Sequence, residues 1–139
     1  MSQMSVPVEK FTTRNPVTAN AEAMIDELRQ LMVEHNIRHL PIVRGTSIVG
    51  VVSDRDLRVV AGLTLAEKMQ VRADDIMSVD PVMVAASTPL DEVARIMADR
   101  KVGSVIVNEE SGGLMGIFTV SDALDALIAM IHKGGAAAS

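Results

Sequence analysis

Residues 50–57 read GVVSDRDL, and residues 116–123 read GIFTVSDA. Both stretches contain a glycine, two apolar residues, a hydroxyl residue, two variable residues and an aspartate, in that order. The flanking residues also match: Asn15-Pro16-Val17 with Asp80-Pro81-Val82, and Ile25, Leu28 and Met32 with Leu90, Val93 and Met97, all at a shift of 65. Agreement at a nearly constant shift over about 45 positions indicates that the chain contains one unit twice.

Each repeat predicts the same series of elements. Residues 15–20 and 80–87 are short extended segments, each with an X-Pro pair that disfavours a helix before it. Residues 21–35 and 88–100 have apolar residues at helical spacing, and Thr88 is the expected cap of the second of these helices. Two β-hairpins follow, formed by 39–43 with 47–52 and by 104–107 with 114–118. Helices near 54–61 and 120–132 complete the repeats.

These elements predict an α/β (α+β) fold. A unit of about 50 residues cannot bury the apolar faces of two helices alone. We therefore expect two tandem β-α-β-β-α units, packed through their sheets with pseudo-twofold symmetry. The expected boundaries are 1–61 for the first unit with its N-terminal segment, 62–75 for a linker with a short helix, 76–133 for the second unit and 134–139 for a flexible tail.

The composition excludes several classes of function. The chain has 139 residues, no cysteine, three histidines and a formal net charge of −5. The absence of cysteine excludes disulfides and thiolate metal sites, and basic residues do not cluster as nucleic-acid binding requires. No Ser-His-Asp set, metal cluster or phosphate-binding glycine loop is present, so we expect neither an enzyme nor a metal protein. No signal peptide or membrane-spanning run is evident, which predicts a cytoplasmic protein.

The duplicated stretch places a hydroxyl and a carboxylate together. Ser53 and Thr119 stand at the expected start of a helix, where free backbone N–H groups favour an anion. Asp56 and Asp122 follow three residues later, about one turn on, so that both groups point to the same side. A carboxylate can accept two hydrogen bonds from neighbouring hydroxyls, which suits the diol of a ribose.

A purely structural role for the same residues is the alternative. Ser and Thr are good N-cap residues, and an acid three positions on is a common capping partner. Both roles can coexist. Gly50 and Gly116, in the strand before the helix, would allow a close backbone approach.

The sequence resembles the CBS domain, named after cystathionine β-synthase, in its stretches RHLPIV, IVGVVSDRDL, DIMSVDPVMV, VGSVIV and LMGIFTVSDAL and in their tandem order. The resemblance covers residues 10–130. It implies a tandem pair, or Bateman module, that binds AMP, ADP, ATP, S-adenosylmethionine or an NAD-type dinucleotide as a regulatory ligand and requires no cofactor. It also implies regulation of an attached or partner protein, and a homodimer.

The resemblance extends the predicted site beyond the hydroxyl–carboxylate pairs. Arg38 and His39 begin a strand that faces the expected cleft, and family members often use basic residues there against phosphates. Ordinary exposed residues are the alternative for both. The second repeat has Gly103 and Ser104 instead, so we expect unequal clefts, and Arg55 could add charge to the first one.

Aliphatic residues and two further hydroxyls complete the candidate set. The family pattern puts Pro41 and Ile106 nearest a purine base, and Thr13 and Ser78 are weaker candidates for the same clefts. The predicted ligand-binding residues are Thr13, Arg38, His39, Leu40, Pro41, Ser53, Arg55, Asp56, Ser78, Ser104, Val105, Ile106, Thr119 and Asp122.

The sequence therefore predicts a regulatory module that binds adenosine-containing ligands in clefts between two CBS units and transmits its state to a protein partner. The alternative is a ligand-independent dimerisation or protein-interaction module whose clefts are vestigial. The expected partners are an adenosine-containing small molecule, a second copy of the chain and a regulated protein, without nucleic acid or membrane.

Overall fold

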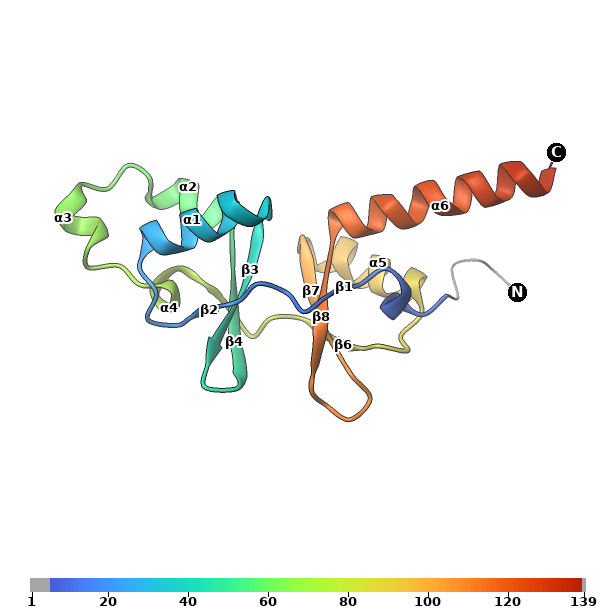
Figure 1. Ribbon diagram of the computed structural model, residues 1–139, viewed down its shortest axis with the longest axis horizontal. Helices are drawn as coiled ribbons and strands as arrows, with labels where there is room; N and C mark the ends of the chain where they lie inside the picture. Colours follow the sequence, from blue (N-terminus) through green and yellow to red (C-terminus); the bar gives the residue numbers. More distant parts are fainter. Residues whose placement is uncertain (1–5, 139) are drawn as a thin grey trace. The chain divides into compact units, whose positions relative to one another are not determined.

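The computed structural model describes the backbone of residues 6–138 and the side chains of residues 6–133. The chain forms two compact units, which we call the first unit (Pro16–Pro81) and the second unit (Met1–Asn15 together with Val82–Ser139). Each contains one four-stranded sheet with helices (Figure 1). The predicted mixed α/β fold is confirmed. Predictions for residues 1–5 and for Ser139 lie outside the described residues.

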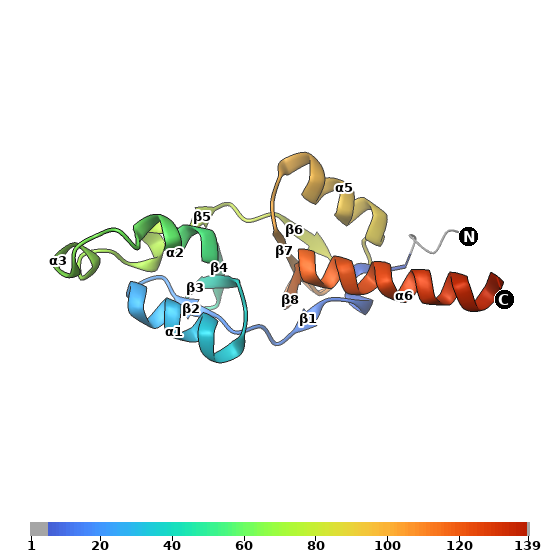
Figure 2. The same ribbon diagram turned by 90° about the horizontal axis from the view of Figure 1, so that it is seen from above.

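The sheet of the first unit has the strand order β2-β3-β4-β5. Strands β3 and β4 form the predicted antiparallel hairpin, with β2 parallel to β3 and β5 antiparallel to β4. Figure 2 shows these four strands next to one another. The strands are β2 (Ala19–Asn20), β3 (His39–Arg44), β4 (Ser47–Ser53) and β5 (Ser78–Val79), and the helices are α1 (Ile25–His35), α2 (Asp54–Val60), α3 (Leu65–Lys68) and α4 (Ala73–Ile76). The expected linker, 62–75, thus contains the short helix α3, and a second short helix, α4, begins in it and ends at Ile76.

The sheet of the second unit has the equivalent order β1-β8-β7-β6. Strands β7 and β8 form the second hairpin, β6 is parallel to β7, and β1 is antiparallel to β8. The strands are β1 (Thr13–Arg14), β6 (Met83–Ala85), β7 (Ser104–Asn108) and β8 (Leu114–Thr119). The helices are a 3-10 turn (Val8–Lys10), α5 (Leu90–Arg100) and α6 (Val120–Ala138).

One strand of each sheet comes from the segment that precedes the other repeat. Thr13 in β1 stands before the first repeat but pairs with Ile117 in β8. Ser78 in β5 stands before the second repeat but pairs with Val51 in β4. The open edge of each hairpin has unpaired backbone groups, and these short strands satisfy them. The expected boundaries, which kept each segment with the repeat that follows it, therefore differ from the observed units.

The glycine of each repeated stretch makes room for this added strand. A Cβ on Gly116 would fall on the carbonyl oxygen of Thr13 and lie 2.9 Å from Cγ2 of Thr12. A Cβ on Gly50 would lie 2.8 Å from the carbonyl oxygen of Ser78. The close backbone approach expected at both glycines is therefore that of β1 and β5.

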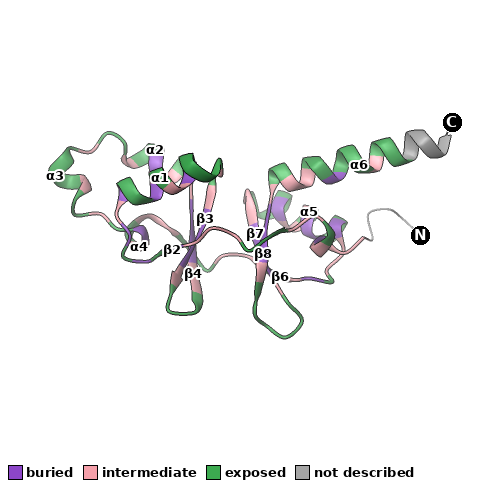
Figure 3. Cartoon of the chain, viewed as in Figure 1, coloured by how far each residue is buried: buried purple, intermediate pink, exposed green. Residues whose placement is uncertain are grey.

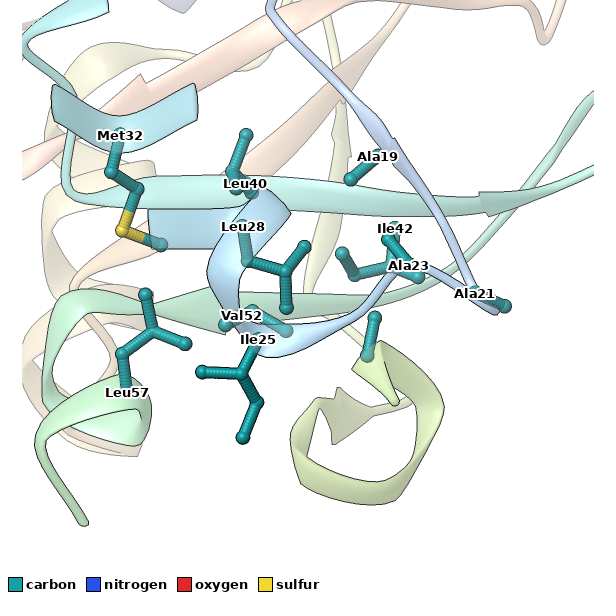
Figure 4. Packing of buried hydrophobic residues seen from close by; sticks show 11 residues of the cluster. Ala19, Ala21, Ala23, Ile25, Leu28, Met32, Leu40, Ile42, Val52 and Leu57 are labelled. Atoms are coloured by element: carbon teal, nitrogen blue, oxygen red, sulfur yellow. The ribbon is translucent and has the colours of Figure 1, made fainter. Parts of the chain in front are cut away.

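The core of each unit lies between its sheet and its helices. In the first unit, Leu28 and Met32 of α1 pack with Leu40 of β3, Val52 of β4 and Leu57 of α2 (Figure 4). The second unit repeats this arrangement with Val93, Met97, Val105, Val107 and Phe118. Because side chains alternate along a strand, His39 and Pro41 lie on the face of their sheet opposite to Leu40.

Two helix ends differ from the prediction. The N-cap of α5 is Pro89, without a side-chain hydrogen bond, and the N–H of Leu90 donates to the carbonyl oxygen of Val6 at 2.8 Å. The predicted Thr88 cap is therefore wrong, because the N-terminal segment supplies a backbone acceptor instead. Helix α6 continues to Ala138, so residues 134–138 of the expected tail are helical.

Candidate ligand-binding sites

Ser53 and Asp56 form a reciprocal capping box at the start of α2. The N–H of Ser53 donates to Oδ2 of Asp56 at 2.8 Å, and the N–H of Asp56 donates to Oγ of Ser53 at 3.2 Å. Both residues are half-buried. Among the described residues, Oδ1 of Asp56 has no hydrogen-bond partner, so this oxygen is available to accept from a ligand hydroxyl.

Thr119 and Asp122 form the equivalent pair at the start of α6. The N–H of Thr119 donates to Oδ2 of Asp122 at 2.9 Å, and the N–H of Asp122 donates to Oγ1 of Thr119 at 3.4 Å. Here the other carboxylate oxygen is occupied, because the hydroxyl of Thr13 donates to Oδ1 of Asp122 at 3.1 Å. The capping role is thus present in both repeats. Within the described part of the chain, Asp56 keeps one carboxylate oxygen without a hydrogen bond, whereas both oxygens of Asp122 accept one.

The strand register gathers most of the predicted residues on one face of each sheet. In the first unit His39 is opposite Ser53, and Pro41 is opposite Val51, which in turn pairs with Ser78. Cross-strand partners share a face, and alternate residues of a strand do too, so these side chains lie on the face away from the helices. We call this the ligand face of the first unit.

The second unit has a ligand face of the same construction. Ser104 is opposite Thr119, and Ile106 is opposite Ile117, which pairs with Thr13. The structure thus places Thr13 and Ser78 at equivalent positions of the two sheets, and Thr13 also contacts the Asp122 carboxylate. The signal in the sequence was their equal spacing from the two X-Pro pairs, but that spacing did not show that each belongs to the other repeat.

Four predicted residues lie elsewhere. Leu40 and Val105 are buried in the helix-side cores of their units. Arg55 is exposed on α2. Arg38 lines a hollow of about 680 Å³, which we call the helix-side hollow because it lies among residues of α1, α2 and α3. Arg38 stands before β3, which begins at His39, so the two neighbours are separated by the start of the strand.

Burial lowers the pKa of His39 below its ordinary value of 6.5. The nearby Asp56 carboxylate opposes this shift, and the Arg38 guanidinium adds to it. His39 is therefore mainly neutral at pH 7 and offers a hydrogen bond rather than a fixed positive charge. A phosphate bound beside it would raise the pKa and draw a proton onto the ring.

Within residues 6–138, no three His, Asp or Glu side chains are grouped as a metal ion would require. No helix in this described part is long and apolar enough to cross a membrane.

The CBS domain family model matches residues 8–61 and 73–129. The chain therefore belongs to the CBS domain family and carries the domain twice. It is 36% identical over 114 residues to inosine-5'-monophosphate dehydrogenase of Korarchaeum cryptofilum, a match that covers 82% of this chain but only 23% of that protein. It is 28% identical over 139 residues to a CBS domain-containing protein of Dictyostelium discoideum, covering 93% of this chain and 96% of that protein.

Solved structures of CBS domain pairs are similar to the whole fold. CBSX2 in complex with AMP has a TM-score of 0.77 and 27% identity, and the match covers 90% of this chain and 98% of that chain. The CBS domain of a bacterial CNNM/CorC family Mg2+ transporter in complex with ATP has a TM-score of 0.80 and 25% identity, covering 91% and 89%. The predicted CBS resemblance is thereby confirmed.

Proposed function

We propose that this chain is a regulatory module that binds an adenosine-containing ligand such as AMP, ADP or ATP and transmits the bound state to a protein partner. The observation that carries the proposal is the repeated hydroxyl–carboxylate pair, which lies beside the ligand face of each unit. The similarity to CBS structures bound to AMP and to ATP supports it. S-adenosylmethionine and NAD-type dinucleotides remain within the proposed ligand class.

The two ligand faces differ in what they offer to a ribose phosphate. Oδ1 of Asp56 accepts hydrogen bonds from the ribose diol, and His39 adds a donor for a phosphate oxygen. At the second face, a ribose has to share Oδ1 of Asp122 with the hydroxyl of Thr13 or displace that hydroxyl, and Ser104 stands where the first unit has His39. We therefore propose that the first unit binds the nucleotide more tightly.

The proposal is tested by thermal unfolding of the full chain with AMP, ADP, ATP, S-adenosylmethionine and NADH. A ligand that binds only the folded state adds about 2.7 kcal/mol at a hundred times its dissociation constant, which gives a clear shift. 2′-Deoxy-AMP, which lacks the diol, is the matched control and is expected to bind much more weakly. If no adenosine compound shifts the unfolding temperature, the proposal fails.

The module is proposed to act without catalysis, without a required cofactor and in the cytoplasm. The dehydrogenase relative is matched over less than a quarter of its length, so its activity is not carried over to this chain. Regulation needs a ligand with different affinities for two states of the module, because a ligand with equal affinities shifts nothing.

A ligand-independent interaction module is a second candidate, favoured by the surface of α6. Leu124, Leu127, Ile128 and Ile131 are between 52% and 62% exposed and follow each other at helical spacing. Much of the described part of α6 is coloured as exposed in Figure 3. An apolar stripe of this kind is typical of a helix that packs against a partner. We propose that it forms the homodimer.

The dimer is tested by light scattering coupled to gel filtration. Leu127→Glu with Ile131→Glu is expected to give a monomer. Ala129→Glu, on another side of α6, is the control and should leave the dimer intact. If the stripe variant remains a dimer, the interface lies elsewhere. If it becomes a monomer and still binds AMP, assembly and ligand binding are separate properties.

A further inference from the structure

The helix-side hollow of the first unit is strongly basic. Four of its lining residues are cations, Arg29, Arg38, Arg58 and Lys68, whereas Asp54 is its single acid. Among the described residues, Arg58 alone of these four has an ion-pair partner, at 3.5 Å from Oδ2 of Asp54. Arg29, Arg38 and Lys68 form no ion pair in the part of the chain that the structure describes. This concentration of positive charge contrasts with the net charge of −5 of the whole protein.

The duplication shows that the fold does not need these cations. The positions of Arg29, Arg38 and Arg58 correspond to Ala94, Gly103 and Leu124 in the second repeat at the same shifts of 65 and 66. The second repeat nevertheless forms the same hairpin, helices and capping box. The Ser/Thr–Asp pair, which caps a helix, is present in both repeats, but the three arginines are present only in the first. Packing alone therefore does not account for three arginines around one hollow.

We propose that the helix-side hollow is an anion site for a phosphate-bearing small molecule, separate from the nucleotide site on the ligand face. Like-charged groups repel each other unless a counter-ion is bound, and guanidinium groups bind phosphate oxygens with two parallel hydrogen bonds. The volume of about 680 Å³ matches a ligand of nucleotide size. Met32, Ile37 and Leu57 give the hollow an apolar part against which the body of such a ligand can pack.

The site extends the proposed function, because it gives the first unit a second input that the second unit lacks. A polyphosphate there would act on α1 and α2, and α2 also carries Asp56 of the ligand face. Binding at one site can therefore change affinity at the other, and this coupling has to be reciprocal.

The test is calorimetric titration of the full chain with inorganic tripolyphosphate at low salt. The double variant Arg29→Gln with Arg58→Gln is expected to lower the association constant about tenfold or more. Arg95→Gln with Arg100→Gln removes the same charge from α5, outside the hollow, and should change it less than about threefold. Equal losses in the two double variants would overturn the proposal, because they would indicate attraction by net charge alone.

Two further measurements separate this site from the proposed function. The AMP-induced thermal shift should persist in Arg29→Gln with Arg58→Gln. Asp56→Asn should leave tripolyphosphate binding nearly unchanged. A large gain in affinity, as expected when a carboxylate is removed from beside a bound anion, would place the anion at the ligand face and overturn the proposal. A hexaglutamate peptide that binds more tightly than tripolyphosphate would also contradict it, since the hollow would then receive a protein segment. If AMP fails to bind while the tripolyphosphate pattern holds, the proposed function fails and the anion site stands.

Discussion

In each unit, a short strand from the segment before the other repeat completes the sheet, and both candidate sites depend on this arrangement. Gly116→Ala tests it for β1 and β8. The new Cβ would fall on the carbonyl oxygen of Thr13, a backbone atom that cannot rotate away. The chain can relieve the overlap only by moving β1 from the edge of β8. That movement also withdraws the Thr13 hydroxyl from Asp122, because the pairing of Thr13 with Ile117 sets its position.

The expected cost follows from what β1 contributes. Its two residues pair with Ile117 and Gly116, and each lost backbone hydrogen bond costs about 0.5–1.5 kcal/mol. The exposed bond from Thr13 to the Asp122 carboxylate adds about 1 kcal/mol. Gly116→Ala should therefore lower the free energy of unfolding by about 2–4 kcal/mol, a large share of a typical total of about 5–15 kcal/mol.

The assay is thermal and urea unfolding followed by circular dichroism, together with limited trypsin digestion. Each kcal/mol should lower the midpoint by about 3–5 °C for a chain of this size. Trypsin should cut at Arg14 faster in the variant, because the segment is released. Gly113→Ala is the control, since its Cβ would meet nothing within 4 Å. If both variants unfold like the parent chain, β1 is not held against β8 as described.

Other predictions concern single side chains. The pKa of His39 is below 6.5 in the folded chain, so the unfolded chain binds more protons between pH 6.5 and the folded-state pKa. The free energy of unfolding should therefore decrease as the pH falls through this range. Urea titrations of His39→Gln should show a smaller decrease. AMP affinity, measured by isothermal titration calorimetry, should in turn rise as the pH falls toward 6.5. His39→Gln should show no such rise. A rise of the same size in this variant would show that His39 does not contact the phosphate. Lys101 ends α5 with φ at 56°, so Lys101→Gly should stabilise the chain by about 0.5–1 kcal/mol in thermal unfolding. Asn36→Gly at the equivalent end of α1 should gain less, because Asn tolerates this conformation better than Lys, and an equal gain would argue against backbone strain as the cause.

Local periodicity and duplication were sufficient to predict the hairpins and the four main helices. Leu28 and Met32 recur as Val93 and Met97 because both helices bury the same face against a sheet, and such a pattern is readable in the sequence. Strands β1 and β5 were not predictable in this way, because two residues carry no period and their pairing partners are distant in the chain. The glycines at 50 and 116 were the feature of the sequence that reflects these strands, because both strands approach a glycine closely.

The candidate sites could be predicted only in part for a related reason. The pairs Ser53–Asp56 and Thr119–Asp122 depend on contacts within one helical turn, which spacing alone determines. Arg38 and His39 are adjacent in the sequence, but where each side chain lies depends on where β3 begins and on what packs on each side of it. The lowered pKa of His39 also depends on tertiary burial, which no motif encodes. Binding by these residues remains a prediction.

The most direct test of the account is the AMP affinity of Asp56→Asn beside that of Asp122→Asn, measured by isothermal titration calorimetry. Asparagine can keep the capping bond through its carbonyl oxygen but presents an NH₂ group where Asp56 has its free Oδ1, so the fold should persist while the ribose diol loses its acceptor. We predict that Asp56→Asn weakens AMP binding at least about tenfold and that Asp122→Asn weakens it far less. Unchanged AMP binding in Asp56→Asn, with the chain folded, would contradict the claim that this carboxylate accepts hydrogen bonds from the ribose of the nucleotide.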